Sequence, residues 1–431
     1  MNKKFQKMLS VVLPAFLFAN NVSFARENKE LWLIPATSIT ILSIPVIAYL
    51  LKKENITLDS YVNKNLVYSP LSLKAALIMA ANGTSNSTVR KNVADYVGFE
   101  SLEDANNWLK KIMDTKIDGV NIANSMWYTN TLRNCDIDKS KYNNFKNFIT
   151  SNLKAECDSI DVSNGHERIN NWISQKTENK IPSIFDKLDP ETLLVLVNTI
   201  YFNSKFAEKF EYTGSIEFNG IDKKTENVPT IKDKDEDSRS CDYCATNDYQ
   251  AVRIPFEKNG CYLYMVLPKT NNEFDKVKNV DVKELAKNMK TKNVHLEIPR
   301  FKIESSLTLN DYCNSNNLLQ ALMNAKLDNI HPLAKISKIV QKVVFEITPE
   351  GVEAAAASGD EAVKECYTFP TKPNVNMIFD HTFIVFITDK DNNVLFKVNI
   401  KNIDEVGKKS IKSEHNDETY DELKAVVKTD S

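Results

Sequence analysis

The sequence predicts an α+β fold built around large β-sheets. Apolar residues recur at helical spacing mainly in the first half of the chain, whereas strand-like apolar runs dominate the second half. No internal repeat divides the 431 residues, and a hydrophobic content of 42% allows a sizeable core. Helices that are segregated from strands along the sequence are typical of α+β domains.

Three helices are predicted from caps and apolar spacing. Ser69–Ala81 opens with Ser-Pro, a capping residue followed by proline at the first helical position, where no amide is needed. Asn106–Lys116 has an amphipathic pattern, and His166–Lys180 is predicted to be a polar helix.

Strands dominate from Leu193 onward. Leu193–Phe202 is a continuous apolar run rich in β-branched residues, which is typical of a strand buried on both faces. Asp222–Asp248 is polar and charged, so we expect a surface excursion there. The other predicted strands are Gly119–Asn130, Tyr249–Pro255, Cys261–Pro268, Val294–Ile303, Ile336–Thr348, and a closing hairpin of Phe383–Thr388 and Val394–Ile400.

The two ends of the chain differ from the predicted domain, 54–404. Residues 1–25 have the basic start, apolar centre and small residues of a signal peptide, which predicts a secreted or extracellular protein. The hydrophobic segment 31–53 is long enough to span a bilayer as a membrane anchor, but its apolar spacing equally suits the first helix of the domain. Residues 405–431 form a charged tail that we expect to be flexible.

Composition and motifs argue against catalysis. A net charge of −2 removes a general electrostatic case for nucleic acid. Seven cysteines make no disulfide framework, and the Cys241–Cys244 CxxC has no second copy to complete a zinc site. The sequence contains no HExxH, no GxSxG and no glycine-rich phosphate loop. We therefore expect no enzyme activity, no metal and no cofactor.

The most informative segment follows Ile336–Thr348. It runs Gly351, Val352, Glu353, Ala354, Ala355, Ala356, Ala357 and Ser358. Small residues at alternate positions suit a strand that is exposed first and buried later. The alternative is an ordinary alanine-rich helix that begins near Glu350.

Five segments in the same order resemble the serpins, a family of protease inhibitors that insert their own loop into a sheet. The resemblance spans roughly Ile56 to Asn402. The segments that carry it are Asn65–Ser72 (N-x-x-x-S-P-x-S), Asn170–Ile181, Val195–Phe202, Pro299–Glu304 (similar to P-K-F-x-I-E), and the hinge with its four alanines.

The resemblance implies a serpin fold with three β-sheets, about eight or nine helices and an exposed reactive-centre loop. It implies a monomeric suicide-substrate inhibitor of serine proteases, with cysteine proteases as a second class of target. The alternative is a non-inhibitory serpin-fold binding protein or a plain protease substrate.

The resemblance also implies site residues. The hinge is Gly351–Ser358, and counting along the loop places the reactive bond at Glu365–Cys366, with Lys364 as the alternative specificity residue. A buried polar cluster where the strands part would comprise Ser69, Ser72, Asn198 and Gln341. The chain departs from the family pattern by having Pro349 for a glutamate, Val352 for Thr or Ser, Gln341 for a histidine, and Phe206 for a tryptophan.

Overall fold

The computed structural model describes residues 65–115, 117, 119–130, 138–222, 224–233, 238–258, 260–352 and 375–403. The predicted signal peptide, the hydrophobic segment 31–53 and the tail 405–431 lie outside the described residues. None of the helices in the described ranges is long and apolar enough to cross a membrane.

Nine α-helices and one short 3-10 helix, η3 (Asn271–Glu273), form in the described part of the chain. As predicted, Ser69 caps the helix that follows it, because its side chain accepts a hydrogen bond from the Ser72 amide at 3.1 Å. The α-helices are α3 (Pro70–Asn82), α4 (Ser87–Val97), α5 (Leu102–Asp114), α6 (Lys139–Asn152), α7 (Gly165–Lys176), α8 (Phe274–Val277), α9 (Val282–Asn288), α10 (Asn310–Ser315) and α11 (Gln320–Asn324).

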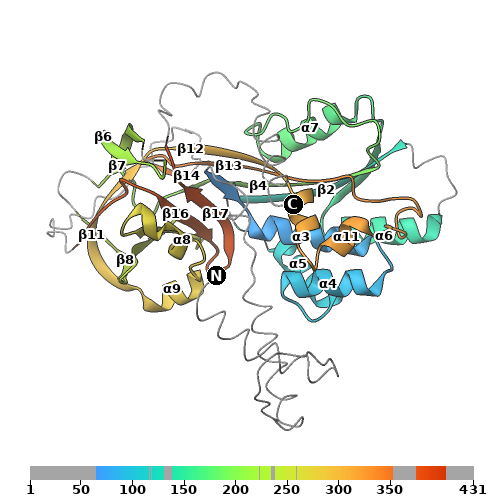
Figure 1. Cartoon of the computed structure of the whole chain (residues 1–431), viewed down its shortest axis with the longest axis horizontal. Helices are drawn as coiled ribbons and strands as arrows, with labels where there is room; N and C mark the ends of the chain where they lie inside the picture. The colour runs from blue at the N-terminus through green and yellow to red at the C-terminus, as the bar shows by residue number, and fades with distance from the viewer. Residues whose placement is uncertain are drawn as a thin grey trace, which may run out of the picture. The chain divides into compact units, whose positions relative to one another are not determined.

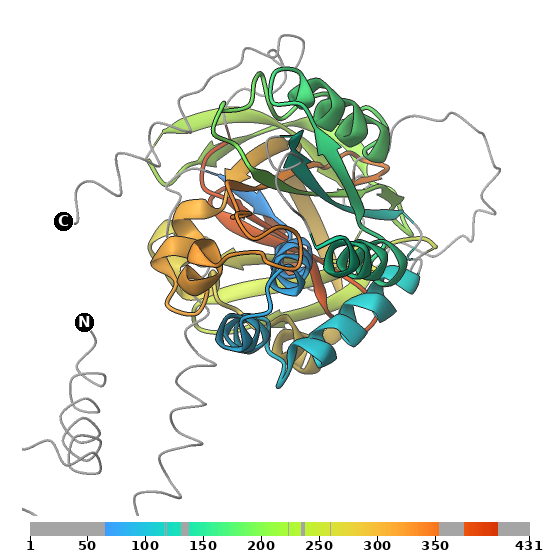
Figure 2. The same ribbon diagram turned by 90° about the vertical axis from the view of Figure 1, so that its right-hand side faces the viewer.

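A five-stranded sheet runs through the centre of the fold (Figure 1). In spatial order its strands are β12 (Lys302–Thr308), β13 (Lys338–Glu346), β4 (Leu194–Phe202), β2 (Val120–Thr129) and β3 (Glu156–Ile160). Figure 2 shows α7 on one face of this sheet and α3 to α5 on the other. Every residue of β4 is buried, as the continuous apolar run predicts for a strand covered on both faces.

The other strands form a ten-stranded sheet and a two-stranded sheet. The large sheet follows the order β1 (Leu66–Tyr68), β17 (Val394–Ile400), β16 (Phe383–Thr388), β10 (Tyr262–Pro268), β9 (Tyr249–Pro255), β8 (Arg239–Ala245), β11 (Lys290–Pro299), β7 (Thr225–Lys232) and β6 (Glu211–Asn219), with β15 (Val375–Ile378) paired to β11. The small sheet pairs β14 (Gly351–Val352) with β5 (Ser204–Lys205).

Aromatic rings fill much of the core between the two large sheets. Phe301 stacks on Phe345 with ring centres 5.7 Å apart, and Phe383 meets Phe301 edge-on at 5.8 Å. Phe206, the residue that follows β5, stacks on Phe256 at 5.4 Å and forms a β-bridge with it. The end of β5 is therefore fixed by an aromatic contact.

The α+β fold class is confirmed, and the described residues contain the predicted three sheets and nine helices. The prediction for Asp222–Asp248 was wrong, because β7 and β8 form there and bury Val228, Ile231 and Cys241.

The segment Val294–Ile303, which was predicted as one strand, belongs to two strands, β11 and β12. The chain leaves the large sheet after Pro299, which has no amide for a ladder, and joins the five-stranded sheet at Lys302.

Candidate functional site

The hinge begins with a tight turn at the end of β13. The Thr348 amide donates to the Gly351 carbonyl at 2.8 Å, and the Gly351 amide donates back to the Thr348 carbonyl at 3.3 Å. Pro349 occupies the first central position of this turn, where its fixed φ is favourable. The structure thus gives Pro349 a turn role and continues Gly351–Val352 as a strand, which disagrees with a helix that starts at Glu350.

Val352 has strand partners on both sides. It pairs antiparallel with Ser204 of β5 and forms an antiparallel bridge with Ile347, the residue just after β13. Its side chain is only 1% exposed. Val352 therefore lies between β5 and the residue that follows β13, and β14 lies beside these strand ends in Figure 1.

The space ahead of Val352 is set by the pairing of β4 with β13. Their parallel register runs from Val195–Lys338 to Thr199–Lys342 and stops there. Both strands continue, to Phe202 and Glu346, without further described pairs between them. A strand that continued from Val352 would run into the region where these two strands part.

Gly351 is required by the close approach of two backbones. A Cβ at this position would lie 2.1 Å from the Ser204 carbonyl oxygen and 2.8 Å from Lys205 Cα. Both atoms belong to the backbone of β5, so a side chain cannot be accommodated by a rotamer change. The glycine identified from the sequence is thus the residue that permits β14 to pair with β5.

The predicted polar cluster is divided into two hydrogen-bonded pairs. The Ser69 amide donates to Gln341 Oε1 at 3.0 Å, and Gln341 Nε2 donates to the Ser69 carbonyl at 3.1 Å. Ser72 joins only through its amide, since its buried hydroxyl has no described partner. The amide of Gln341 therefore ties the start of α3 to β13 with both of its polar atoms.

Asn198 has a partner that sequence reasoning missed. Its Nδ2 donates to Oδ1 of Asn124 on β2, and the two residues are opposite each other in the β2–β4 register. Gln341 on β13 is opposite Asn198 in the β4–β13 register. Asn124, Asn198 and Gln341 therefore form one buried row across three strands. Only the strand register could reveal Asn124, because it lies 74 positions away from Asn198.

A family model described as "Serpin (serine protease inhibitor)" matches residues 50–402. The chain belongs to the serpin family. This match agrees with the hinge geometry and with the five segments found in the sequence.

Relatives of this serpin match it over about three quarters of its length. It is 29% identical over 366 residues to "Leukocyte elastase inhibitor A" of Rattus norvegicus, covering 78% of this chain and 93% of the relative. It is 27% identical over 364 residues to "Serpin B8" of Homo sapiens, covering 78% and 92%. It is 26% identical over 356 residues to an uncharacterized serpin-like protein of Methanosarcina mazei, covering 77% and 80%.

Solved structures confirm the fold. Serpin48 of the insect Tenebrio molitor aligns with a TM-score of 0.66 and 23% identity, covering 83% of this chain and 97% of that one. Human thyroxine-binding globulin in complex with thyroxine aligns with a TM-score of 0.68 and 22% identity, covering 83% of this chain and 97% of that one. The likeness to these two structures is one of fold.

Part of the predicted site of this serpin lies outside the described residues. Glu353 to Ser358, the reactive bond Glu365–Cys366 and the alternative Lys364 all fall in the range 353–374. The positions proposed for them remain predictions.

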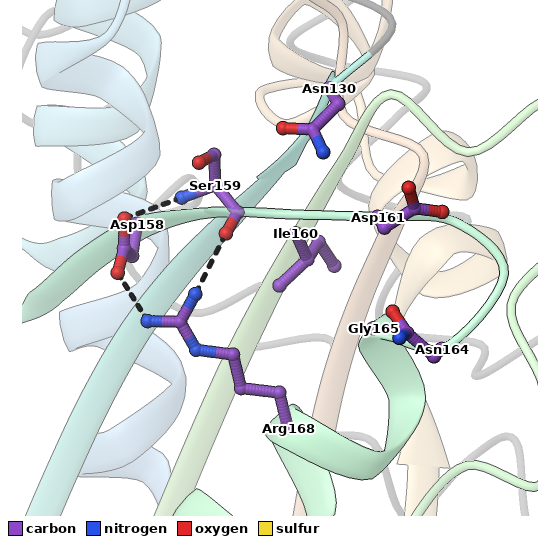
Figure 3. Close-up of a pocket in the computed structure, with 8 residues that line it drawn as sticks. All are labelled: Asn130, Asp158, Ser159, Ile160, Asp161, Asn164, Gly165 and Arg168. Carbon is purple, nitrogen blue, oxygen red and sulfur yellow. Dashed lines mark hydrogen bonds and ion pairs between the residues drawn. The ribbon is translucent and has the colours of Figure 1, made fainter.

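A polar pocket of about 390 Å³ lies where β3 passes into α7 (Figure 3). Arg168 Nη1 donates to the Ser159 carbonyl at 2.9 Å, and the guanidinium forms an ion pair with Asp158. Asp161 accepts a hydrogen bond from the Ser163 amide at 2.9 Å. These charged groups hold the β3–α7 connection, and we assign them no ligand.

Proposed function

We propose that this serpin is a suicide-substrate inhibitor of serine proteases, with cysteine proteases as a second class of target. A protease cleaves the reactive-centre loop, and the part that follows Val352 inserts between β4 and β13. The observation that supports this proposal is the position of Val352, which is buried and already pairs on one side with Ser204 and on the other with Ile347.

The free energy available from insertion is large. A new middle strand adds on the order of ten ladder hydrogen bonds at about 1 kcal/mol each. The sum of roughly 10 kcal/mol compares with the whole stability of an ordinary domain. Insertion can therefore provide the work needed to distort a protease that is attached to the cleaved loop.

The side chains of the loop suit this movement. Val352 faces the core, so Ala354, Ala356 and Ser358 would follow it on the same face of an extended strand. All three are small, and Glu353 falls on the opposite face. A segment of this composition can become buried without placing a charge in the core.

We propose Glu365–Cys366 as the reactive bond, which favours a protease that cleaves after an acidic residue. If cleavage occurs after Lys364 instead, the target is trypsin-like. Mass spectrometry of the carboxyl-terminal fragment distinguishes these cases, because only the first produces a fragment that begins at Cys366.

The test of inhibition uses a panel of proteases with acidic, basic and aromatic specificities. A target should give a complex that survives boiling in detergent, and protein nicked in the loop should melt well above intact protein. Ala356→Arg should convert the inhibitor into a substrate because the arginine would enter the core. Ala355→Arg is the matched control on the opposite face, and we expect it to retain more inhibition.

The alternative is a non-inhibitory serpin that binds a ligand or is merely cleaved. The unusual Pro349 and Val352 favour this reading. It would be supported if no protease formed a stable complex and nicked protein melted at the same temperature as intact protein. Such a result would contradict insertion.

We also propose that the protein acts outside the cell or at its surface, on the basis of residues 1–25 and 31–53. Fractionation of expressed protein with and without a carbonate wash tests this proposal. Protein that is soluble without carbonate is secreted, protein that only carbonate releases is peripheral, and protein that stays with the membrane after carbonate is anchored by 31–53.

A further inference from the structure

The hinge is held by a short irregular segment, residues 206–210, which we call the hinge-receiving segment. The Phe206 amide donates to the Glu350 carbonyl at 2.8 Å, and the Phe210 amide donates to the Pro349 carbonyl at 2.9 Å. These two bonds extend the short β14–β5 pairing. The position of the hinge-receiving segment therefore determines where the middle strand begins.

Arg239, the first residue of β8, holds the other side of this segment. Its Nη1 donates to the Glu208 carbonyl at 3.0 Å, and its Nη2 donates to the Lys209 carbonyl at 3.4 Å. Its guanidinium carbon lies 3.6 Å from the centre of the Phe210 ring. A planar guanidinium can make these contacts together, whereas an ammonium group acts as a point charge.

The charge of Arg239 is matched by Asp233, and both residues are buried. Arg239 Nε donates to Asp233 Oδ1 at 2.6 Å, and the side chains are 4% and 5% exposed. Asp233 Oδ2 accepts a second bond from the Leu296 amide of β11 at 3.0 Å. The pair thus ties the hinge-receiving segment to the centre of the large sheet.

Stability alone does not explain this arrangement. Burying two charges costs several kcal/mol, and apolar side chains of similar volume often serve as well. What apolar residues could not do is bind the Glu208 and Lys209 carbonyls. The contacts of Arg239 are directed at the segment whose amides face the hinge.

We propose that Arg239, oriented by Asp233, is a positioning residue for loop insertion. It holds the hinge-receiving segment so that the amides of Phe206 and Phe210 keep the start of the middle strand in place. After cleavage, insertion then begins from an ordered end and outruns hydrolytic release of the protease. The effect of Arg239 on inhibition rests on the proposed inhibitory function, whereas its positioning of residues 206–210 does not.

The test compares Arg239→Lys with Arg253→Lys. Arg253 on β9 is a matched control because it also pairs with an aspartate, Asp242, and lies over a ring, Tyr262 at 4.5 Å, without a described contact to residues 206–210. Arg239→Lys should speed hydrogen exchange of the Phe206 and Phe210 amides about tenfold. It should also raise the number of inhibitor molecules consumed per protease about twofold or more, with the rate of protease association unchanged.

The two readouts separate the possible failures. Unchanged exchange in Arg239→Lys, or an equal change in Arg253→Lys, overturns the inference. If hydrogen exchange of the Phe206 and Phe210 amides becomes faster but the number of inhibitor molecules consumed per protease does not change, the role of Arg239 in inhibition is overturned. If the unmodified protein inhibits no protease, the proposed function fails, and the exchange data still decide whether Arg239 positions the segment. If Arg239→Lys does not fold, Phe210→Leu removes the stacked ring and carries the same expectations.

Discussion

Replacing Gly351 with alanine tests the docked hinge directly. The added Cβ would lie 2.1 Å from the Ser204 carbonyl oxygen and 2.8 Å from Lys205 Cα, and both atoms are backbone. Since neither can rotate away, we expect β14 to leave β5. The two bonds from Phe206 and Phe210 would be lost, at about 1 kcal/mol each.

Undocking would also expose Val352, which is 1% exposed in the folded protein, at a cost of about 2 kcal/mol. Together these losses lower the free energy of unfolding by about 4 kcal/mol. Urea unfolding of intact protein measures this change. A protease titration in parallel should show more cleaved inhibitor and less stable complex.

Gly220→Ala is the matched control for this prediction. Its Cβ would approach Asn402 Oδ1 at 2.2 Å, but that atom ends a side chain and can move. We expect the control to lose less than about 1 kcal/mol. If Gly351→Ala unfolds at the same urea concentration as the unmodified protein and inhibits equally well, the reasoning about hinge docking is refuted.

Three further predictions follow from buried polar and ionisable groups. Asn198→Ala should lower the free energy of unfolding by about 1–3 kcal/mol and impair inhibition, because it leaves the buried Oδ1 of Asn124 without its donor; unchanged melting and inhibition would contradict this. Burial lowers the pKa of His381, but hydrogen bonds to the Asp380 carboxylate and a backbone carbonyl outweigh it and raise the pKa overall. The stabilising contribution of His381 should be complete below about pH 6.5, its ordinary pKa, and should disappear as the pH rises through its higher pKa in the folded protein. Thermal melts of His381→Gln should therefore depend less on pH than those of the unmodified protein. Burial raises the pKa of Cys313 to about 12 and also raises that of the half-buried Cys244. Because Cys244 is the more exposed of the two, alkylation of native protein should modify Cys244 before Cys313, and mass mapping that finds the reverse order would sink this prediction.

Local patterns predicted the elements whose burial is uniform. The continuous apolar run of β4 and the Ser-Pro cap of α3 both specify their structures within a few residues. Asp222–Asp248 was misread because its strands carry polar residues at alternate positions, and because Asp233 and Arg239 form a buried ion pair there. Charge in a sequence predicts exposure unless a partner exists, and the partner of Arg239 is recognisable only in the folded sheet.

The sequence by itself determined the family, the order of the segments and the alternation of small side chains beyond Gly351. These properties depend on neighbouring residues, so they can be recognised without a fold. Only the tertiary structure decided that Asn124 is the partner of Asn198, that Gly351 meets the backbone of Ser204, and that Arg239 holds the segment which receives the hinge. Each of these contacts joins segments that are distant in the chain. Their register is set by packing of the whole core, which no local pattern records.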